Sequence, residues 1–321
     1  MSRKCNNQGR AYEFAWINAL ADALAPERNV VVTKNSSYEA NRRAWDSLAH
    51  DKQELYRISA SAAIPTVLEL EPRMTENSGD TLTLTPQKDG SGITGDVRDM
   101  VIRRGAINWE IGLSIKHNHE AVKHCRLSHR LDFGKEWFDR PCSTQYWSDI
   151  KPVFDMLKSE QRKGVKFSQL PDKEYDVYLP LLNAFINEVN RQYAAAPETA
   201  RKMIEYLIGV TDYYKIISHD AKRLTVIRTF NVNGTLGQPA AAKISAITVP
   251  VLSLPTRLIA LQRKPGSNTT AEMYLDNGWQ LSFRIHNAED KIAPTLKFDI
   301  QFVGIPPEVL SIECRWDTKG S

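Results

Sequence analysis

One stretch of the chain, residues 95–118, constrains the fold most because it has the pattern of two paired strands. An apolar run at 100–102 follows two acids, and a short break at 103–106 separates it from a second run that alternates strictly between apolar and polar residues. Successive side chains of a strand point to opposite faces, so this alternation predicts a half-buried strand. Its predicted core face carries Trp109, Ile111, Leu113 and Ile115, and its other face carries Glu110, Gly112, Ser114 and Lys116.

The polar face of this predicted hairpin combines the groups that metal-assisted phosphodiester hydrolysis uses. An acid at the start of the first strand, Asp96 or Asp99, would face Glu110 and Lys116 on the second strand. Carboxylates can hold a divalent cation that activates water, and an ammonium can stabilise the charge that develops on phosphorus. The alternative is an ordinary half-solvated sheet, whose outer face is also charged.

The segment 103–135 carries the positive charge of the chain. It holds seven Lys or Arg residues against three acids, an excess of four that equals the formal net charge of +4, and four of the seven His residues. Such a segment beside a carboxylate hairpin is suited to holding a phosphate backbone, although a solvated basic surface is the alternative. The predicted contacts to DNA in this segment are His117, His119, Lys123, Arg126 and Arg130.

In the rest of the chain, the predicted secondary structure changes from mainly helices to mainly strands near residue 220. Apolar stripes at helical spacing predict helices over 8–25, 36–50, 52–71, 173–193 and 197–209, and a further helix beginning at 117–128, with 135–170 irregular. Later runs predict strands at 226–230, 244–252, 257–261, 270–275, 279–285 and 297–303. The sequence therefore predicts an α+β chain with a helical and hairpin-containing domain at 1–217, a β-rich region at 218–317 and a tail at 318–321.

Composition and motifs exclude several classes of protein. The four cysteines are scattered without a CxxC pair, which argues against a disulfide framework or a zinc finger and fits a reduced, cytoplasmic setting. The N-terminus has no apolar signal core, and no apolar run is long enough to span a membrane. Ligand spacing is poor for a zinc cluster in the His-rich segment, and no phosphate-binding glycine loop is present.

Five blocks of sequence resemble the HaeIII-like type II restriction endonucleases. They are GDVRD at 95–99, WEIGLSIKHNH at 109–119, AVKHCRLS at 121–128, GWQLSFRIHNA at 278–288 and LKFDIQ at 296–301. The resemblance implies a PD-(D/E)xK nuclease core, a mixed sheet flanked by helices, in front of the β-rich C-terminal region that the strand pattern predicts. It also implies Mg²⁺-dependent cleavage of double-stranded DNA at a short palindrome, GGCC for this family. A palindrome would be cut by a homodimer or by sequential nicking.

One position departs from the pattern of that superfamily. Its acid-x-lysine signature would place an acid at Ser114, two residues before Lys116. Some members carry serine there and take the carboxylate from elsewhere, which leaves Glu110 and Glu120 as candidates. Strand periodicity favours Glu110 because it shares a face with Lys116. For the first acid, Asp99 is preferred to Asp96 because it directly precedes the apolar run.

These observations lead to one expected function and one rival. We expect a Mg²⁺-dependent type II endonuclease in which Asp99 and one of the two glutamates bind metal. Lys116 would then orient the attacking water or stabilise the transition state, with Ser114 beside it. The rival is a non-catalytic, sequence-specific DNA-binding protein on a nuclease fold that has lost the acid at position 114.

Base reading is expected in the C-terminal region. Readout of G·C pairs favours Arg or Lys donating to guanine O6 and N7. The region supplies Arg263, Arg284 and Asn287, whereas the basic segment near 115–130 is better placed to hold the backbone. For Arg284 the alternative is a surface strand residue paired with Asp299 or Glu289.

Overall fold

The computed structural model describes residues 3–88, 96–241 and 244–316. It contains two compact units, one made of Met1–Glu120, Gly209–Leu252 and Pro307–Ser321, the other of Ala121–Ile208 and Ser253–Pro306. These units do not coincide with the division expected at residue 217, because strands after residue 209 return to pair with the predicted hairpin. The expected tail, 318–321, lies outside the described residues.

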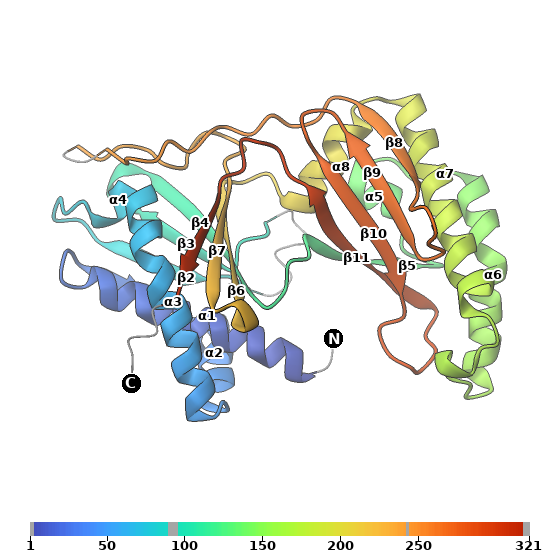
Figure 1. The fold of residues 1–321 in the computed structure, drawn as a ribbon, viewed down its shortest axis with the longest axis horizontal. Helices are drawn as coiled ribbons and strands as arrows, with labels where there is room; N and C mark the ends of the chain where they lie inside the picture. The colour runs from blue at the N-terminus through green and yellow to red at the C-terminus, as the bar shows by residue number, and fades with distance from the viewer. Residues whose placement is uncertain (1–2, 89–95, 242–243, 317–321) are drawn as a thin grey trace. The chain divides into compact units, whose positions relative to one another are not determined.

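The first unit is built on a seven-stranded sheet (Figure 1). Its elements are α1 (Arg3–Leu24), β1 (Val30–Val32), α2 (Ser36–Asp46), α3 (His50–Leu70), α4 (Pro72–Thr75), β2 (Leu82–Pro86), β3 (Met100–Arg104), η2 (Gly105–Ile107), β4 (Trp109–His117), β6 (Tyr213–His219), η5 (Asp220–Lys222), β7 (Leu224–Phe230) and β12 (Ser311–Arg315). The strand order is β1-β2-β3-β4-β6-β7-β12. The predicted hairpin is confirmed, since β3 and β4 pair antiparallel.

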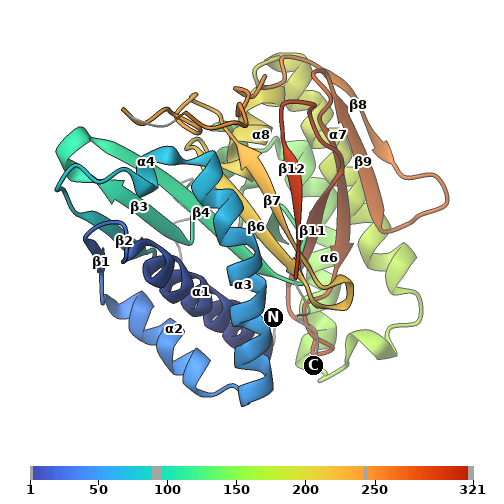
Figure 2. The same cartoon turned by 60° about the vertical axis from the view of Figure 1, so that its left-hand side comes forward.

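Helices α1, α2 and α3 lie together beside this sheet (Figure 2). The helix predicted at 8–25 forms α1, and its apolar stripe is fully buried at Tyr12, Trp16, Leu20 and Leu24. The apolar face of β4 enters the same core. Asn35 begins α2, because its side chain accepts hydrogen bonds from two backbone N–H groups of the first turn.

The second unit has a five-stranded antiparallel sheet with helices against one face. Its elements are β5 (Lys123–Ser128), α5 (Phe133–Phe138), α6 (Thr144–Arg162), η3 (Phe167–Gln169), the π-helix η4 (Glu174–Tyr178), α7 (Leu179–Ala195), α8 (Thr199–Ile208), β8 (Leu258–Arg263), β9 (Thr270–Leu275), β10 (Gln280–His286) and β11 (Thr295–Gly304). The strand order is β5-β11-β10-β9-β8. Rings of Phe185, Phe283 and Phe298 meet between α7 and this sheet.

Several predicted elements are wrong. Residues 123–128 form strand β5 rather than a helix, because Cys125 and Leu127 alternate into the core when β5 pairs with β11. Residues 244–252 contain no strand, and 135–170 contain α6 rather than irregular chain. Strands β1, β6 and β12 were not predicted. The coarse α+β class is confirmed.

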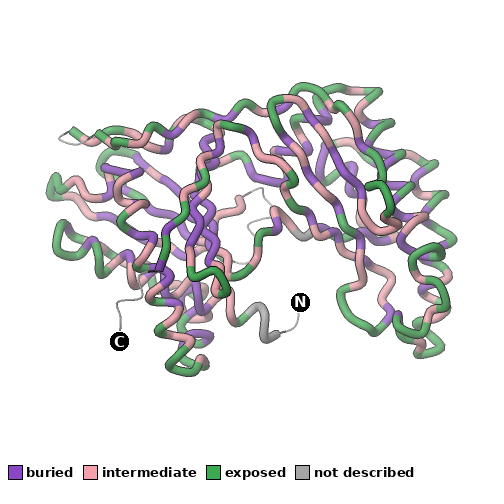
Figure 3. Tube along the Cα trace, in the orientation of Figure 1, coloured by how far each residue is buried: buried purple, intermediate pink, exposed green. Residues whose placement is uncertain are grey.

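Burial follows the two sheets and the helix faces that pack on them (Figure 3). Within the described residues, no helix has the length and apolar character needed to cross a membrane.

One acid is buried in the core of the first unit. Glu71 follows α3 and is fully buried. Its Oε1 accepts hydrogen bonds from the Tyr214 hydroxyl at 2.6 Å and from the backbone N–H of Gly237 at 2.7 Å. Burial raises the pKa of Glu71 to about 7, against the opposing effect of these two donors.

The raised pKa predicts that Glu71 makes stability depend on pH. A carboxyl that resists ionisation in the folded state stabilises the fold below its unfolded pKa, and this contribution is lost as pH rises through about 7. Glu71→Gln keeps an acceptor for Tyr214 and Gly237 but cannot ionise. We expect the variant to gain on the order of 3 kcal/mol relative to wild type between pH 4.5 and pH 8. Denaturant unfolding across this range measures the difference, and a constant difference would contradict the assignment.

Candidate active site

Strand β4 has the two faces that its sequence predicts. Trp109, Ile111, Leu113 and Ile115 are at most 5% exposed and belong to the core beside α1. The opposite face is polar, and its strand neighbours are β3 on one side and β6 on the other.

Asp99 lies against the end of β4 that carries Ser114 and Lys116. It immediately precedes β3, and its backbone N–H donates to the carbonyl of Leu113. Its Oδ2 accepts hydrogen bonds from Lys116 Nζ at 2.8 Å, from the backbone N–H of Ile115 at 2.6 Å and from Ser114 Oγ at 3.3 Å. The structure therefore brings Asp99, Ser114 and Lys116 together.

Glu110 lies toward the other end of β4 and is held by arginines. Its Oε1 accepts from Arg98 at 2.6 Å, and its Oε2 accepts from Arg103. Burial would raise the pKa of Glu110, but the hydrogen bonds from Arg103 and Arg98 outweigh it and lower the pKa. Glu110 and Lys116 are six positions apart, which is roughly 20 Å at the rise of a strand, so a shared face does not bring them together.

Asp96 belongs to the same arginine network as Glu110. Its two oxygens accept hydrogen bonds from Arg98, both at 2.8 Å. Arg98 reaches Glu110 by crossing β4 at Gly112, where a Cβ would lie 1.9 Å from the Arg98 Cδ. Asp96 and Glu110 therefore form an ion-pair network that is distinct from the contacts of Asp99.

Glu120 lies in the segment after β4, next to the strands β6 and β7. Its carboxylate is 3.4 Å from His219 Nε2 and 3.6 Å from Arg228, and its side chain is 47% exposed. Burial lowers the pKa of His219, against the opposing charge of Glu120. These contacts are long, so the Glu120 carboxylate is held more loosely than that of Glu110.

Lys215 joins Asp99 and Glu120 electrostatically and was not predicted. It lies on β6 in register with Ser114 and is 3% exposed. Its Nζ donates to the backbone carbonyl of Glu120 at 3.3 Å. Burial, reinforced by Lys116 and Arg228 and opposed by both acids, lowers the pKa of Lys215 to about 7. The available signal was a single lysine within the apolar run YYKII at 213–217.

The donor set fits a hard divalent cation with few protein ligands. Within the described residues, no group of three or more His, Cys, Asp or Glu side chains could form a complete metal cage. Among the described residues, the three donors that reach Asp99 all bind Oδ2, so Oδ1 would be the atom offered to a cation. Magnesium keeps several waters and needs only one or two carboxylates together with substrate phosphate.

The predicted DNA-contacting histidines differ in their surroundings. The His117 side chain is 6% exposed, lies against Tyr12 and Tyr56, and its Nδ1 is 2.9 Å from Ser218 Oγ. Burial lowers the pKa of His117, against the opposing charge of Asp220. His119 is only partly buried in the segment that leads to Glu120. His117 is therefore part of the packing behind the site.

Strand β5 separates two predicted phosphate contacts. Lys123 points to the helix-covered side, where its Nζ donates to the Tyr206 carbonyl at 2.9 Å and lies 3.6 Å from that ring. Burial lowers the pKa of Lys123. Arg126 is exposed and stands in register with Lys297 of β11. Arg126 is thus on the accessible face of the sheet.

The other predicted DNA contacts are distributed over the second unit. Arg130 and Arg263 are exposed, and Arg263 ends the edge strand β8. Arg284 is paired with Asp299 at 3.5 Å, which is the alternative that its strand position suggested. Asn287 accepts a hydrogen bond from the Tyr178 hydroxyl at 2.6 Å.

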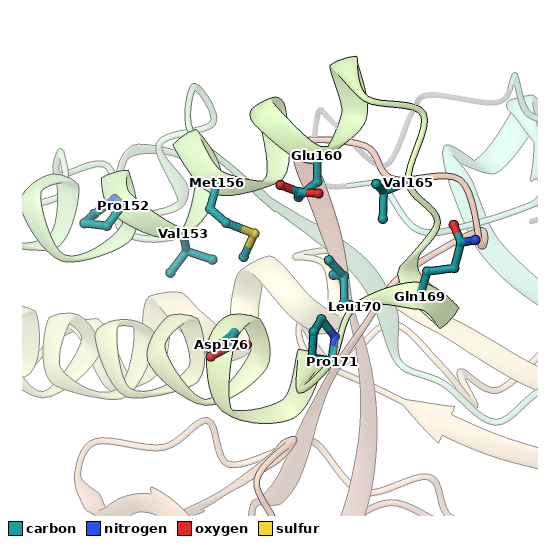
Figure 4. A pocket seen from close by; sticks show the side chains of 9 residues that line it. All are labelled: Pro152, Val153, Met156, Glu160, Val165, Gln169, Leu170, Pro171 and Asp176. Atoms are coloured by element: carbon teal, nitrogen blue, oxygen red, sulfur yellow. The ribbon is translucent and has the colours of Figure 1, made fainter.

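A cavity of about 740 Å³ lies in the second unit, beside α6 (Figure 4). Its lining is largely apolar and consists of Pro152, Val153, Met156, Glu160, Val165, Gln169, Leu170, Pro171 and Asp176. None of the predicted site residues lines it, so it is separate from the hairpin chemistry.

Comparison with known proteins gives a family match over nearly the whole chain. The family model "HaeIII restriction endonuclease" matches residues 9–306. The type II restriction enzyme HaeIII of Haemophilus aegyptius is 46% identical over 318 residues, which cover 99% of this chain and 100% of that relative. No solved structure gives a significant match.

Proposed function

The chain belongs to the HaeIII restriction endonuclease family and is a type II restriction endonuclease, and from this premise we propose that it cleaves double-stranded DNA within GGCC with Mg²⁺ bound at Asp99 and Glu120. The observation that carries the proposal is the Asp99–Lys116 pair on the β3–β4 hairpin. An acid before one strand and a lysine on its neighbour match the PD-(D/E)xK arrangement, which we propose for this sheet. A cytoplasmic location is proposed because the substrate is DNA.

We propose Glu120 as the second acid in place of Glu110. Both oxygens of Glu110 are engaged by arginines, and it lies far along β4 from Lys116. Glu120 is half exposed, and Lys215 interacts electrostatically with both Glu120 and Asp99. The loss of the signature acid at Ser114 is thus compensated by a carboxylate from the segment after β4.

The side chains of the site have separable tasks in phosphodiester hydrolysis. When bound, Mg²⁺ would activate a water and neutralise charge on the phosphate. Ser114 and the Ile115 N–H hold Asp99 Oδ2 and so orient the carboxylate, which would hold the cation through Oδ1. Lys116, with its side chain 33% exposed, can turn from Asp99 to a non-bridging phosphate oxygen and stabilise its growing charge.

DNA contacts are proposed for the exposed cations Arg126, Arg130, Arg263 and Arg284. Arg284 is included because its side chain is 59% exposed and its ion pair with Asp299 is long, at 3.5 Å, so a base edge can compete for the guanidinium. Lys123, His117 and Asn287 are engaged within the fold and contribute by supporting neighbouring elements. A palindromic site would be met by a homodimer or by two successive nicks.

The function is tested with a duplex that contains one GGCC and a matched duplex with a scrambled site. We expect cleavage only of the GGCC duplex and only with Mg²⁺, with EDTA abolishing it. A protein that retards the GGCC duplex in a gel but leaves it intact in Mg²⁺ would instead be the non-catalytic DNA-binding protein.

Assigning the second metal ligand to Glu120 and not to Glu110 predicts different cleavage rates for the two Glu→Gln variants. Glu120→Gln should slow single-turnover cleavage about 100-fold or more, because it removes a proposed metal ligand, and this corresponds to about 3 kcal/mol. Glu110→Gln should cut at nearly the wild-type rate and lose only some stability through Arg98 and Arg103. Single-turnover rates over a Mg²⁺ titration compare them. An inactive Glu110→Gln beside an active Glu120→Gln would reverse the assignment.

A further inference from the structure

Lys215 is a lysine buried within a strand, which is unusual for this residue type. Lysine is almost never fully buried unless it is paired, because removing an ammonium from water is costly. Yet Lys215 is 3% exposed in the middle of β6, between Tyr214 and Ile216, which both enter the apolar core on the other face. An apolar residue of similar size at this position would avoid the desolvation cost.

The position of Lys215 is set by its neighbours on the polar face. It stands directly beside Ser114 on β4 and beside Arg228 on β7. Its ammonium reaches the backbone carbonyl of Glu120, at 3.3 Å, and it interacts with the charges of both Asp99 and Glu120. Lys215 therefore connects Ser114, the position that lacks the signature acid, with the segment that carries Glu120.

We propose that Lys215 is a positioning residue of the active site, which fixes the segment carrying Glu120 so that its carboxylate can share a cation with Asp99. The inference rests on the proposed function, because it gives Glu120 a catalytic task. The hydrogen bond to the Glu120 carbonyl holds the main chain, while Arg228 and His219 approach the carboxylate. The ammonium also offsets the repulsion between two carboxylates that share one cation.

The test is Lys215→Met, which keeps the length of the side chain and removes the ammonium. We expect the single-turnover rate at saturating DNA to fall about 10- to 100-fold, as for other residues that orient a metal ligand. DNA binding in EDTA should not change, because Lys215 is buried. The melting temperature without metal should be equal to or above that of wild type, since a buried charge is lost. The rise in melting temperature that Mg²⁺ produces should shrink, because a displaced ligand weakens metal binding.

Further variants test whether the effect of Lys215→Met is specific to this position and whether it acts through Glu120. Lys222→Met removes an exposed lysine from the adjacent turn η5 and should behave as wild type in all four measurements. Lys215→Gln retains a donor near the Glu120 carbonyl and should recover part of the lost rate. If Lys215 acts through Glu120, the double variant Lys215→Met/Glu120→Gln should cut no more slowly than Glu120→Gln alone.

Failure of the proposed function can be distinguished from failure of the positioning role of Lys215. A wild-type protein that leaves the GGCC duplex intact in Mg²⁺ refutes the proposed function itself. A wild-type enzyme that cuts, together with a Lys215→Met variant that cuts equally fast, overturns only the positioning role. A rate loss accompanied by a lower metal-free melting temperature also overturns it, because Lys215 would then be a structural residue.

Discussion

Asp99→Asn is expected to reduce single-turnover cleavage about 1000-fold or more, a loss of about 4 kcal/mol in transition-state stabilisation. The substitution is nearly isosteric, and the Asn oxygen can still accept from the Ile115 N–H and from Ser114. What disappears is the negative charge that would hold the cation and that pairs with Lys116. The effect should therefore fall on chemistry and on the Mg²⁺ dependence of the rate, and only slightly on folding.

The control for Asp99→Asn is Asp96→Asn, three residues earlier in the chain. Asp96 is bound to Arg98 in the other ion-pair network, so its variant should lose stability but retain cleavage. Single-turnover rates at saturating Mg²⁺ and thermal unfolding of both proteins make the comparison. An active Asp99→Asn protein would contradict the assignment of the metal ligand to Asp99. An inactive Asp96→Asn protein with wild-type stability would assign the ligand to Asp96 instead.

The second large effect is expected from Lys116→Met, with a fall of about 100- to 1000-fold in the cleavage rate. This is the range seen when one preorganised electrostatic stabiliser is removed from an active site. Affinity for the GGCC duplex in EDTA should change little, because one phosphate contact among many contributes little to binding. Asp99 should remain in place, since Ile115 and Ser114 still bind its Oδ2.

A structural ion pair would behave differently from a catalytic lysine. If Lys116 serves only to pair with Asp99, its partly exposed salt bridge is worth about 1 kcal/mol or less, and Lys116→Met would cut at the wild-type rate. The Lys222→Met protein again controls for the general loss of a cation from this unit. Gel retardation in EDTA and single-turnover cleavage in Mg²⁺ separate binding from chemistry.

Local periodicity predicted the parts of the fold that depend on local contacts. Strand β4 alternates strictly, and α1 repeats apolar residues every four positions at Tyr12, Trp16 and Leu20. Each pattern lies within a single element. Both patterns are directly visible in the sequence, and both elements lie where they were expected. The pairing of β3 with β4 needed only a short turn, so it could also be predicted.

Elements that depend on distant partners could not be predicted in the same way. Strand β5 looked like a basic helix start because Lys123 and Arg126 mask its alternation, and only pairing with β11 defines its two faces. Strand β6 reads as a plain apolar run, and its parallel pairing with β4 is invisible without the structure. The same long-range pairing conceals Lys215 beside Ser114.

The candidate site was predicted in its local part only. Asp99, Ser114 and Lys116 lie within one hairpin, so sequence spacing sufficed to group them. Glu110 was favoured because periodicity reports the face of a strand but not the distance along it. His219 and Arg228 join Glu120 through β6 and β7, about 100 residues later in the chain, and no local pattern indicates that contact.

The register of β4 with β6 also has a consequence for biosynthesis. Ser114 and Lys215 are neighbours in the sheet but are separated in the chain by the whole segment Ala121–Ile208, which belongs to the other unit. Ribosomes deliver the chain from its N-terminus, at roughly 5–20 residues per second. A nascent chain therefore exposes Asp99 and Lys116 well before the strands that complete their surroundings have emerged. An interrupted chain that ends before β6 therefore carries Asp99, Lys116 and Glu120 but lacks Lys215 and the strand that pairs with β4.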